Sequence, residues 1–374
     1  MLDISLIMLG AGESSRFKMP VKKQWLRLGD EPLWLYASRN LAKILPFKEI
    51  IIATKENELE YMKSFEARFK YIRGGQTRQE SLKNALELVN SEYVMTSDIA
   101  RPYILPEMVL DLVASITKSS CAVPVLNVAD TAFLGSASIN RDELKLIQTP
   151  QISRTDLLKK ALKSQKIFTD DSSAIQAMGG KICYIKGDEK ARKITFKDDL
   201  RFLELPRASQ VYFSGNGFDV HSFCKGEYIT LCGVKIPHEK ALKAHSDGDA
   251  PLHALCDAIY GASGLGDIGE HFPDTDMRFK GACSKDLLKT CIKMVRNFGF
   301  DIVNADITIL AQRPKITPFK AQMRQSVASI LGIGENFVNI KATTMEKMGF
   351  IGREEGIGAI ASVSLKYYEW HKDI

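Results

Sequence analysis

Short apolar runs alternate with segments of helical periodicity along the first two hundred residues. The runs predict buried strands, at Ile4–Leu9, Glu49–Ala53, Tyr93–Thr96 and Cys121–Leu126. The periodic segments between them predict helices, at Leu33–Lys43, Arg78–Leu88 and Pro106–Ile116. Strands that alternate with helices predict an α/β domain with a mostly parallel sheet, in which ligands bind beyond the carboxyl ends of the strands.

The pattern changes after residue 210. Further strands are predicted at Val211–Phe213, Tyr228–Leu231, Asn304–Ala311, Val338–Lys341 and Ile360–Leu365, and helices are predicted after Asp249, Ser284 and Pro318. This mixture favours an α+β domain with helices on one face of a sheet. We therefore expect two domains, 1–210 and 211–374. The junction Leu205–Gln210 lacks a Gly/Ser tract, so it is not a long flexible tether.

A candidate metal site lies in the second half. Asp219 and His221 are two residues apart in an extended segment, so their side chains point to the same side. His253 lies four residues into the apolar helical run 250–262 and could supply a third ligand. One carboxylate and two imidazoles suit Zn²⁺ with an open fourth position, although an Asp-x-His pair alone is common in proteins without metals. On spacing alone, Cys256 remains a rival ligand on the same helix face.

A candidate phosphate site follows the first strand. Gly10-Ala11-Gly12 is neither a Walker loop nor a complete dinucleotide fingerprint, and a lone Gly-x-Gly is weak evidence. Arg16 and Lys23 come soon after it, and their charges with the backbone N–H groups of the turn would suit a triphosphate. A second glycine-rich loop, 73–81, opens a helix, and Asp98 ends a strand where it could hold Mg²⁺.

Composition narrows the class of protein. The 374 residues carry a net charge of +6, spread without a long basic run, which favours phosphorylated small molecules over nucleic acid. The seven cysteines are scattered without a Cys-x-x-Cys pair, so we expect no disulfide framework and a cytoplasmic location. No apolar run reaches membrane-spanning length, so no membrane association is expected.

The N-terminal segments resemble 2-C-methyl-D-erythritol 4-phosphate cytidylyltransferases over about residues 1–210. Later matches are Arg141, Thr149-Pro-Gln151, Thr169-Asp-Asp171 and Lys193-Ile-Thr195. The resemblance implies a Rossmann-like nucleotidyltransferase fold and attack of the methylerythritol 4-phosphate on the α-phosphorus of CTP, with release of pyrophosphate. Three positions depart from the family pattern: Lys22 stands for a usual Pro, Ser97 for His and Ile99 for Ala.

This resemblance also implies residue roles. Catalysis would rest on Arg16, Lys23, Arg141 and Lys193. CTP would be bound by Gly10, Ala11, Gly12, Lys23, Gly75, Arg78, Ser81 and Asp98, with Mg²⁺ near Asp98. Methylerythritol phosphate would be bound by Arg101, Arg141, Thr149, Thr169, Lys193 and Thr195.

Residues 212–370 resemble 2-C-methyl-D-erythritol 2,4-cyclodiphosphate synthases. The matching segments are His245–Asp249, Leu265–Gly269, Phe272–Asp276, Lys341–Lys347 and Gly352-Arg353. The resemblance implies that the 2-phosphate of CDP-methylerythritol 2-phosphate attacks the β-phosphate, so that a cyclic diphosphate forms and CMP leaves. Zn²⁺, with Mn²⁺ as an alternative, would be bound by Asp219, His221 and His253, and a second divalent ion, Mg²⁺, by Glu346. Cys256 is then interpreted as core and Asp257 as a carboxylate that orients His253.

The remaining roles rest on the same resemblance. His245 and Thr344 would stabilise the transition state. The substrate would be bound by Asp219, His221, His245, Ser246, Asp267, Ile268, Gly269, Phe272, Asp274, Asp276, Ala311, Lys315, Thr343, Thr344, Met345, Glu346, Phe350 and Arg353. Met345 replaces a usual Thr. The resemblance implies a synthase site between the subunits of a homotrimer, and the cytidylyltransferases form dimers. The expected assembly is therefore a trimer-based homo-oligomer, a hexamer if both preferences act.

Two other interpretations remain open at this point. The chain could be a metal- and nucleotide-binding scaffold with a catalytically degraded N-terminal domain. It could also be a nucleotide-sugar pyrophosphorylase or glycosyltransferase, which would leave the second domain unexplained.

Overall fold

The computed structural model describes residues 2–164 and 166–374. The chain divides into two compact units, Met1–Arg207 with Trp370–Ile374, and Ala208–Glu369. The last five residues are the main difference from the division 1–210 and 211–374. They join the first unit because Trp370 is buried there and its indole Nε1 donates a 2.8 Å hydrogen bond to the Arg27 carbonyl. Among the described residues, none of the helices combines the length and the apolar character needed to cross a bilayer.

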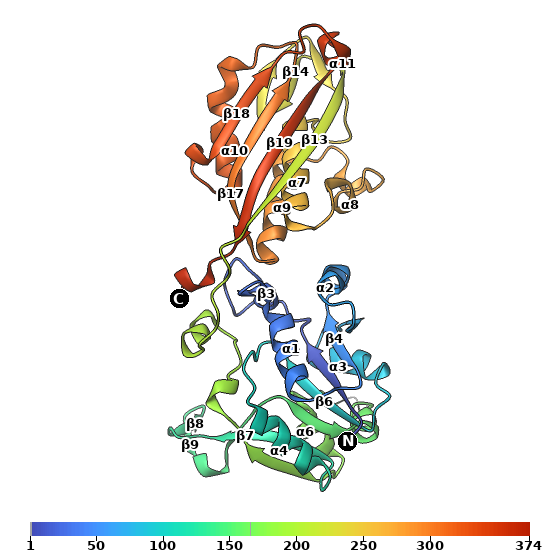
Figure 1. Ribbon diagram of the computed structural model, residues 1–374, viewed down its shortest axis with the longest axis vertical. Helices are drawn as coiled ribbons and strands as arrows, with labels where there is room; N and C mark the ends of the chain where they lie inside the picture. The colour runs from blue at the N-terminus through green and yellow to red at the C-terminus, as the bar shows by residue number, and fades with distance from the viewer. Residues whose placement is uncertain (1, 165) are drawn as a thin grey trace. The chain divides into compact units, whose positions relative to one another are not determined.

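The first unit is a sheet with helices packed on it (Figure 1). Its strands are β1 (Ile4–Leu9), β2 (Arg27–Leu28), β3 (Glu31–Pro32), β4 (Ile50–Thr54), β5 (Lys70–Arg73), β6 (Tyr93–Asp98), β7 (Cys121–Asn127), β8 (Ala132–Leu134), β9 (Ala137–Ile139), β10 (Lys145–Ile147), β11 (Gln151–Arg154) and β12 (Ile182–Lys186). Its α-helices are α1 (Leu33–Ile44), α2 (Leu59–Phe65), α3 (Arg78–Glu87), α4 (Pro106–Ile116), α5 (Thr155–Ala161) and α6 (Asp171–Ala177).

The main sheet has the order β10-β7-β11-β6-β1-β4-β5, with β12 beside β7. The central strand β1 pairs in parallel with β4 and β6, as the pattern predicts. Strands β10 and β11 run antiparallel to their neighbours, so the sheet is mixed. Register matters for the site: Leu9 at the end of β1 lies opposite Asp98 at the end of β6. The glycine turn after β1 and the carboxylate of Asp98 therefore meet at the same edge.

The second unit is an α+β layer in which α7, α9 and α10 pack on one face of a five-stranded sheet (Figure 1). The sheet order is β16-β13-β19-β17-β18. Its strands are β13 (Tyr212–Lys225), β16 (Lys240–Leu242), β17 (Phe300–Leu310), β18 (Val338–Thr343) and β19 (Gly356–Tyr367), and β14 (Tyr228–Leu231) pairs separately with β15 (Val234–Pro237). The helices are α7 (Ala250–Ser263), α8 (Ile268–His271), α9 (Ser284–Asn297), α10 (Lys320–Leu331) and α11 (Gly349–Gly352).

Strand β13 is much longer than the three residues predicted at Val211–Phe213, and its glycines let α7 come unusually close. A Cβ atom on Gly215 would lie 2.0 Å from the Ala258 carbonyl oxygen, and one on Gly217 would lie 2.1 Å from that of Ala254. Only glycine fits at such an approach. The backbone of α7 is thereby held against β13, which brings His253 within reach of Asp219 and His221.

Candidate functional site

A cavity of about 320 Å³ opens at the carboxyl ends of β1 and β6. It collects most of the residues that the sequence predicts for the first site. These are Gly10, Ala11, Gly12, Arg16, Lys23, Gly75, Arg78, Ser81, Asp98, Lys193 and Thr195. The fold brings them together from segments nearly two hundred residues apart.

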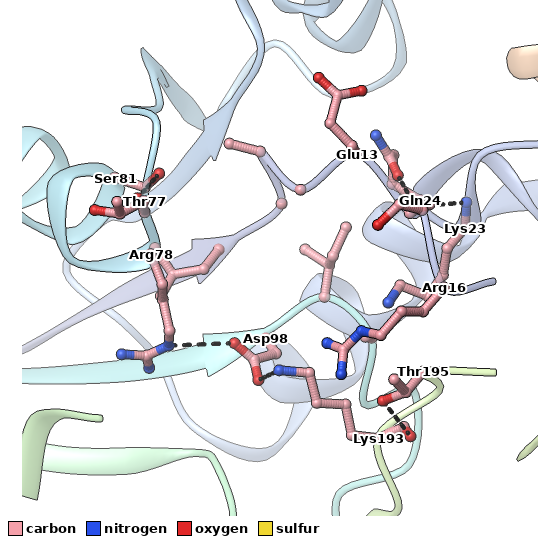
Figure 2. A pocket seen from close by; sticks show the side chains of 18 of the residues that line it. Glu13, Arg16, Lys23, Gln24, Thr77, Arg78, Ser81, Asp98, Lys193 and Thr195 are labelled. Atoms are coloured by element: carbon pink, nitrogen blue, oxygen red, sulfur yellow. Dashed lines mark hydrogen bonds and ion pairs between the residues drawn. The ribbon is translucent and has the colours of Figure 1, made fainter. Parts of the chain in front are cut away.

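Asp98 is the electrostatic centre of this cavity. Figure 2 shows Arg78 and Lys193 approaching its carboxylate from opposite sides, with Lys193 Nζ at 2.7 Å and Arg78 Nε at 3.7 Å. Burial acts to raise the pKa of Asp98, but the charges of Lys193 and Arg78 outweigh it and lower the pKa below its usual value. The carboxylate thus holds two cations at the cavity, and a magnesium ion at Asp98 would compete with both.

Lys23 reaches the same cavity from the short 3₁₀ helix η1 (Lys23–Trp25). Its Nζ donates a 2.8 Å hydrogen bond to the Ile194 carbonyl oxygen. Burial, with the nearby charges of Lys193 and Arg16, lowers the pKa of Lys23 to about 8. A phosphate group that entered the cavity would raise the pKa of this lysine again, because an anion nearby favours the protonated form.

Four predicted residues lie outside the lining of this cavity. Arg101 is buried and donates to the Ala191 carbonyl, and Thr149 accepts a 3.3 Å hydrogen bond from the Asp98 amide, so both support the floor of the site. Thr169 and Arg141 are exposed. Arg141 donates to the Ala129 carbonyl at 2.5 Å, and the structure does not bring it to the cavity of its own chain.

The sequence interpretation missed several residues that line the cavity, among them Glu13, Ser14, Gln24, Gln76 and Thr77. The spacing of Thr77 and Glu80 matches a capping box, which they form at the start of α3, so the sequence could have indicated that Thr77 lies at the start of this helix. Gln24 and Ser14 had none, because their roles depend on contacts with distant side chains.

In the second unit, Asp219, His221 and His253 converge. Asp219 Oδ2 lies 3.0 Å from His221 Nε2 and 3.1 Å from His253 Nδ1, and the two imidazole nitrogens are 3.3 Å apart. Three ligands of one tetrahedral Zn²⁺ at about 2.0–2.1 Å lie roughly 3.3 Å from one another. The donor set and its spacing therefore fit one tetrahedral ion, with one position left for a ligand from substrate or water.

The three groups also perturb each other's proton binding. Burial acts to raise the pKa of Asp219, but hydrogen bonds with His221 and His253 hold that pKa well below its ordinary value. Burial acts to lower the pKa of His253, but Asp219 outweighs it and raises the pKa. Because a metal ligand must be unprotonated, a dication at this point would compete with a proton for His253 Nδ1.

The outer nitrogen of His253 is fixed by partners that the sequence interpretation did not find. His253 Nε2 lies 2.9 Å from Ser284 Oγ, whose hydroxyl is hydrogen-bonded to Asp247, and 3.2 Å from Ser246 Oγ. The interpretation of Asp257 as the orienting carboxylate is wrong, because Asp257 Oδ1 accepts a 2.8 Å hydrogen bond from the Ile268 amide instead. Cys256 is fully buried, as expected for a core residue.

A cavity of about 480 Å³ is lined by Asp219, His221 and His253. The predicted residues along it are Asp219, His221, His245, Ser246, His253, Ile268, Gly269, Phe272 and Asp274. The other predicted substrate residues do not line the cavity of their own chain. They are Asp267, Asp276, Ala311, Lys315, Thr343, Thr344, Met345, Glu346, Phe350 and Arg353.

Both units match known families. Residues 4–205 match the 2-C-methyl-D-erythritol 4-phosphate cytidylyltransferase family, and residues 212–366 match the YgbB family. The bifunctional enzyme IspD/IspF of Campylobacter fetus is 58% identical over 370 residues, which cover 99% of each chain. The chain belongs to the bifunctional IspD/IspF family.

Other IspD/IspF relatives agree over the full length. That of Campylobacter concisus is 56% identical over 371 residues, 99% of each chain. The structure of the bifunctional IspDF from Campylobacter jejuni has a TM-score of 0.94 and 52% identity, covering 99% of this chain and 100% of that one. As an IspD/IspF enzyme of the methylerythritol phosphate pathway, the chain combines a nucleotidyltransferase with a lyase, as predicted. Neither the scaffold nor the sugar-nucleotide interpretation is supported by these similarities.

Proposed function

We propose that the two cavities catalyse separate reactions of one pathway through the residues described above. In the first, the 4-phosphate of methylerythritol phosphate attacks the α-phosphorus of CTP and pyrophosphate leaves. In the second, the 2-phosphate of CDP-methylerythritol 2-phosphate attacks the β-phosphate and CMP leaves. The proposal rests on two sites that suit phosphate groups. In the first, Arg16 and Lys23 lie beside a glycine turn, and in the second, Asp219, His221 and His253 could hold one metal ion.

In the first site, Arg16 and Lys23 donate to the α-phosphate as negative charge builds on its oxygens. Fixed cations in a partly dry pocket stabilise that charge without reorganising, which is the largest catalytic contribution to such a transfer. Lys193 and Thr195 bind the attacking 4-phosphate, and Arg78 binds the nucleotide from the opposite side of Asp98. Asp98 would hold Mg²⁺, which supplies charge neutralisation for the triphosphate, in competition with Lys193 and Arg78.

In the second site, Asp219, His221 and His253 would hold Zn²⁺, which supplies polarisation of the β-phosphate. Ser284 and Asp247 keep the His253 ring oriented so that Nδ1 faces the other two ligands. Ser246 and His245 contact the substrate phosphate from the cavity wall. Glu346, whose carboxylate accepts a 2.8 Å hydrogen bond from Thr344 Oγ1, would hold Mg²⁺ with the diphosphate.

We also propose that the second site is completed by another copy of the chain. Thr343 ends β18, which is three strands from β13 in the sheet, a separation of about 14 Å at the usual strand spacing. Thr344 and Glu346 are exposed, and the open face of the sheet exposes Phe218, Val220 and Ile360. A trimer that covers this face would bring the cytidine-binding half of one copy to the metal-binding half of the next.

The first unit carries a comparable feature. The β8–β9 hairpin exposes Phe133 and Leu134, at 61% and 75%, close in sequence to the exposed Arg141. A dimer through this hairpin would cover the apolar side chains and give Arg141 a phosphate partner in a second copy. Together the two contacts produce the hexamer expected from the sequence.

Mixing two inactive variants tests the shared site. His253→Ala and Thr344→Ala are each expected to release no measurable CMP as pure proteins. In co-expressed, randomly mixed trimers, about one site in four would pair an intact metal half with an intact Thr344, so CMP release should recover to about 25% of wild type. A mixture as inactive as its parents would show that each site is built within one chain.

The function itself is tested with two substrate pairs and metal analysis of the purified protein. CTP with methylerythritol phosphate should yield pyrophosphate, and CDP-methylerythritol 2-phosphate should yield CMP. About one tightly bound Zn²⁺ or Mn²⁺ per chain is expected from the three-ligand site. Pyrophosphate release without CMP release, in metal-replete protein, would overturn the assignment of the second cavity.

A further inference from the structure

Glu58 is a fully buried carboxylate beside the first cavity, in the 3₁₀ helix η2 (Glu56–Glu58) that follows β4. Lys22 Nζ donates to its Oε1 at 2.6 Å, and the two side chains are 15% and 0% exposed. Thr54 Oγ1 lies 3.4 Å from its other oxygen. An unpaired carboxylate in such a position would strongly destabilise the fold, so the Lys22 charge is needed where it lies.

Gln24 connects this ion pair to the glycine turn. Its Nε2 donates to both carboxylate oxygens of Glu58, at 3.3 and 3.2 Å. The amide has one donor end and one acceptor end, so Glu58 determines that the Oε1 of Gln24 faces the opposite way. That Oε1 accepts a 3.2 Å hydrogen bond from Ser14 Oγ.

Ser14 then contacts the lysine segment. Its Oγ accepts a 3.2 Å hydrogen bond from the backbone N–H of Lys23. Ser14 has φ of +56°, a left-handed conformation that is sterically unfavourable for a residue with a side chain. The hydroxyl contacts hold it there, and they lock the turn after β1 to the segment that carries Lys23.

We propose that Lys22 and Glu58 are positioning residues for cytidylyl transfer, which act through Gln24 and Ser14 to place Lys23 and the glycine turn around the triphosphate. The hydrogen bonds run in one consistent direction, from the Lys23 amide through Ser14 and Gln24 to the carboxylate that Lys22 neutralises. A proline at position 22, usual in the family that this unit resembles, carries no cation and could not pair with Glu58 as Lys22 does. The inference rests on the proposed cytidylyl transfer at this site.

The test compares pyrophosphate release by Lys22→Met, Lys22→Arg, Glu58→Gln and the double variant Lys22→Met/Glu58→Gln. Misplacement of Lys23 is expected to lower kcat about tenfold or more in each charge-removing single variant, with a smaller change in KM for CTP. Lys22→Arg should retain kcat within about threefold, because a guanidinium can pair with the same carboxylate. The double variant should lose no more than the worse single variant, because the pair acts as one unit.

The pH profile separates positioning from simple loss of stability. In the wild type, kcat/KM for CTP should fall as the pH rises through about 8, where Lys23 loses its proton. In Lys22→Met this alkaline limb should move to higher pH, because a displaced Lys23 is less buried. A stability effect alone would lower the melting temperature and leave the limb and kcat unchanged.

Lys63→Met is the matched control, because Lys63 forms an exposed ion pair with Glu60 in the adjacent α2. It should match wild type in kcat, KM and pH profile. The melting temperature of the first unit, measured on every variant, reports whether that unit is folded, and CMP release reports the same for the second unit. If Glu58→Gln does not fold, the comparison of Lys22→Met with Lys22→Arg decides: equal kcat and equal pH limbs in both would overturn the inference. Absence of pyrophosphate release in the wild type would instead overturn the proposed function.

Discussion

Replacing His253 with alanine is expected to remove the tightly bound metal and abolish CMP release, while pyrophosphate release from CTP stays within twofold of wild type. The imidazole supplies one of three ligand atoms that lie 3.0–3.3 Å apart around one point. Loss of an outer-sphere partner alone lowers metal affinity about 10–100-fold, so loss of the ligand itself should exceed that. Metal content by mass spectrometry, CMP release by chromatography and a pyrophosphate-release assay check the three results.

His238→Ala is the matched control for this prediction. His238 lies in the same unit, hydrogen-bonds to the backbone of Lys240 and stacks on Phe223, away from the lining of the cavity. It should retain full metal content and CMP release. The metal content and CMP release of Ser284→Ala should lie between those of His253→Ala and His238→Ala, because this substitution removes the partner of His253 Nε2 and leaves the three ligand side chains in place. Full metal occupancy in His253→Ala would contradict the ligand assignment.

The convergence of Asp219, His221 and His253 could be predicted from the sequence, because it follows from the local geometry of one strand and one helix. Asp219 and His221 alternate along a strand, and His253 follows a helix start that Asp249 caps. The orienting group could not be predicted, because Ser284 comes from another helix, thirty-one residues from His253, and no periodicity links the two. The choice of Asp257 followed helix spacing, which places a residue on a face but does not determine its hydrogen-bond partner.

The contrast between local patterns and distant contacts also explains which strands could be predicted. Strand β1 is a continuous apolar run and was predicted at its observed bounds. Strand β11 was not predicted, because its buried residues Gln151 and Ser153 are polar and match no apolar pattern. Gln151 can be buried there since its amide donates to the Gln148 carbonyl and to Asp170, partners that exist only in the folded chain.

Some predicted site residues do not line the cavities of their own chain, and the reason differs from that for Asp257. Arg141 and Glu346 were selected by resemblance, which transfers roles without saying which copy of the chain supplies them. Their exposure in a single chain agrees with sites that we propose to be shared between copies. The resemblance implies that the second site lies between subunits, whereas the exposed side chains through which two copies would meet can be located only in the structure.

Replacing Lys23 with alanine is expected to lower kcat for cytidylyl transfer by about 10²–10³-fold, the usual effect of removing one group that stabilises transition-state charge. CMP release by the second unit should be unchanged, and cytidylyl transfer within a few-fold of wild type would contradict the assignment.

Lys23→Arg keeps the positive charge at position 23 but changes the shape and reach of the group that carries it. A guanidinium stays protonated up to about pH 12, so any remaining activity should lose the alkaline limb near pH 8 that the lowered pKa of Lys23 produces in the wild type. Persistence of that limb in Lys23→Arg would assign it to another group, so the pH profile identifies the titrating residue independently of the size of the rate loss.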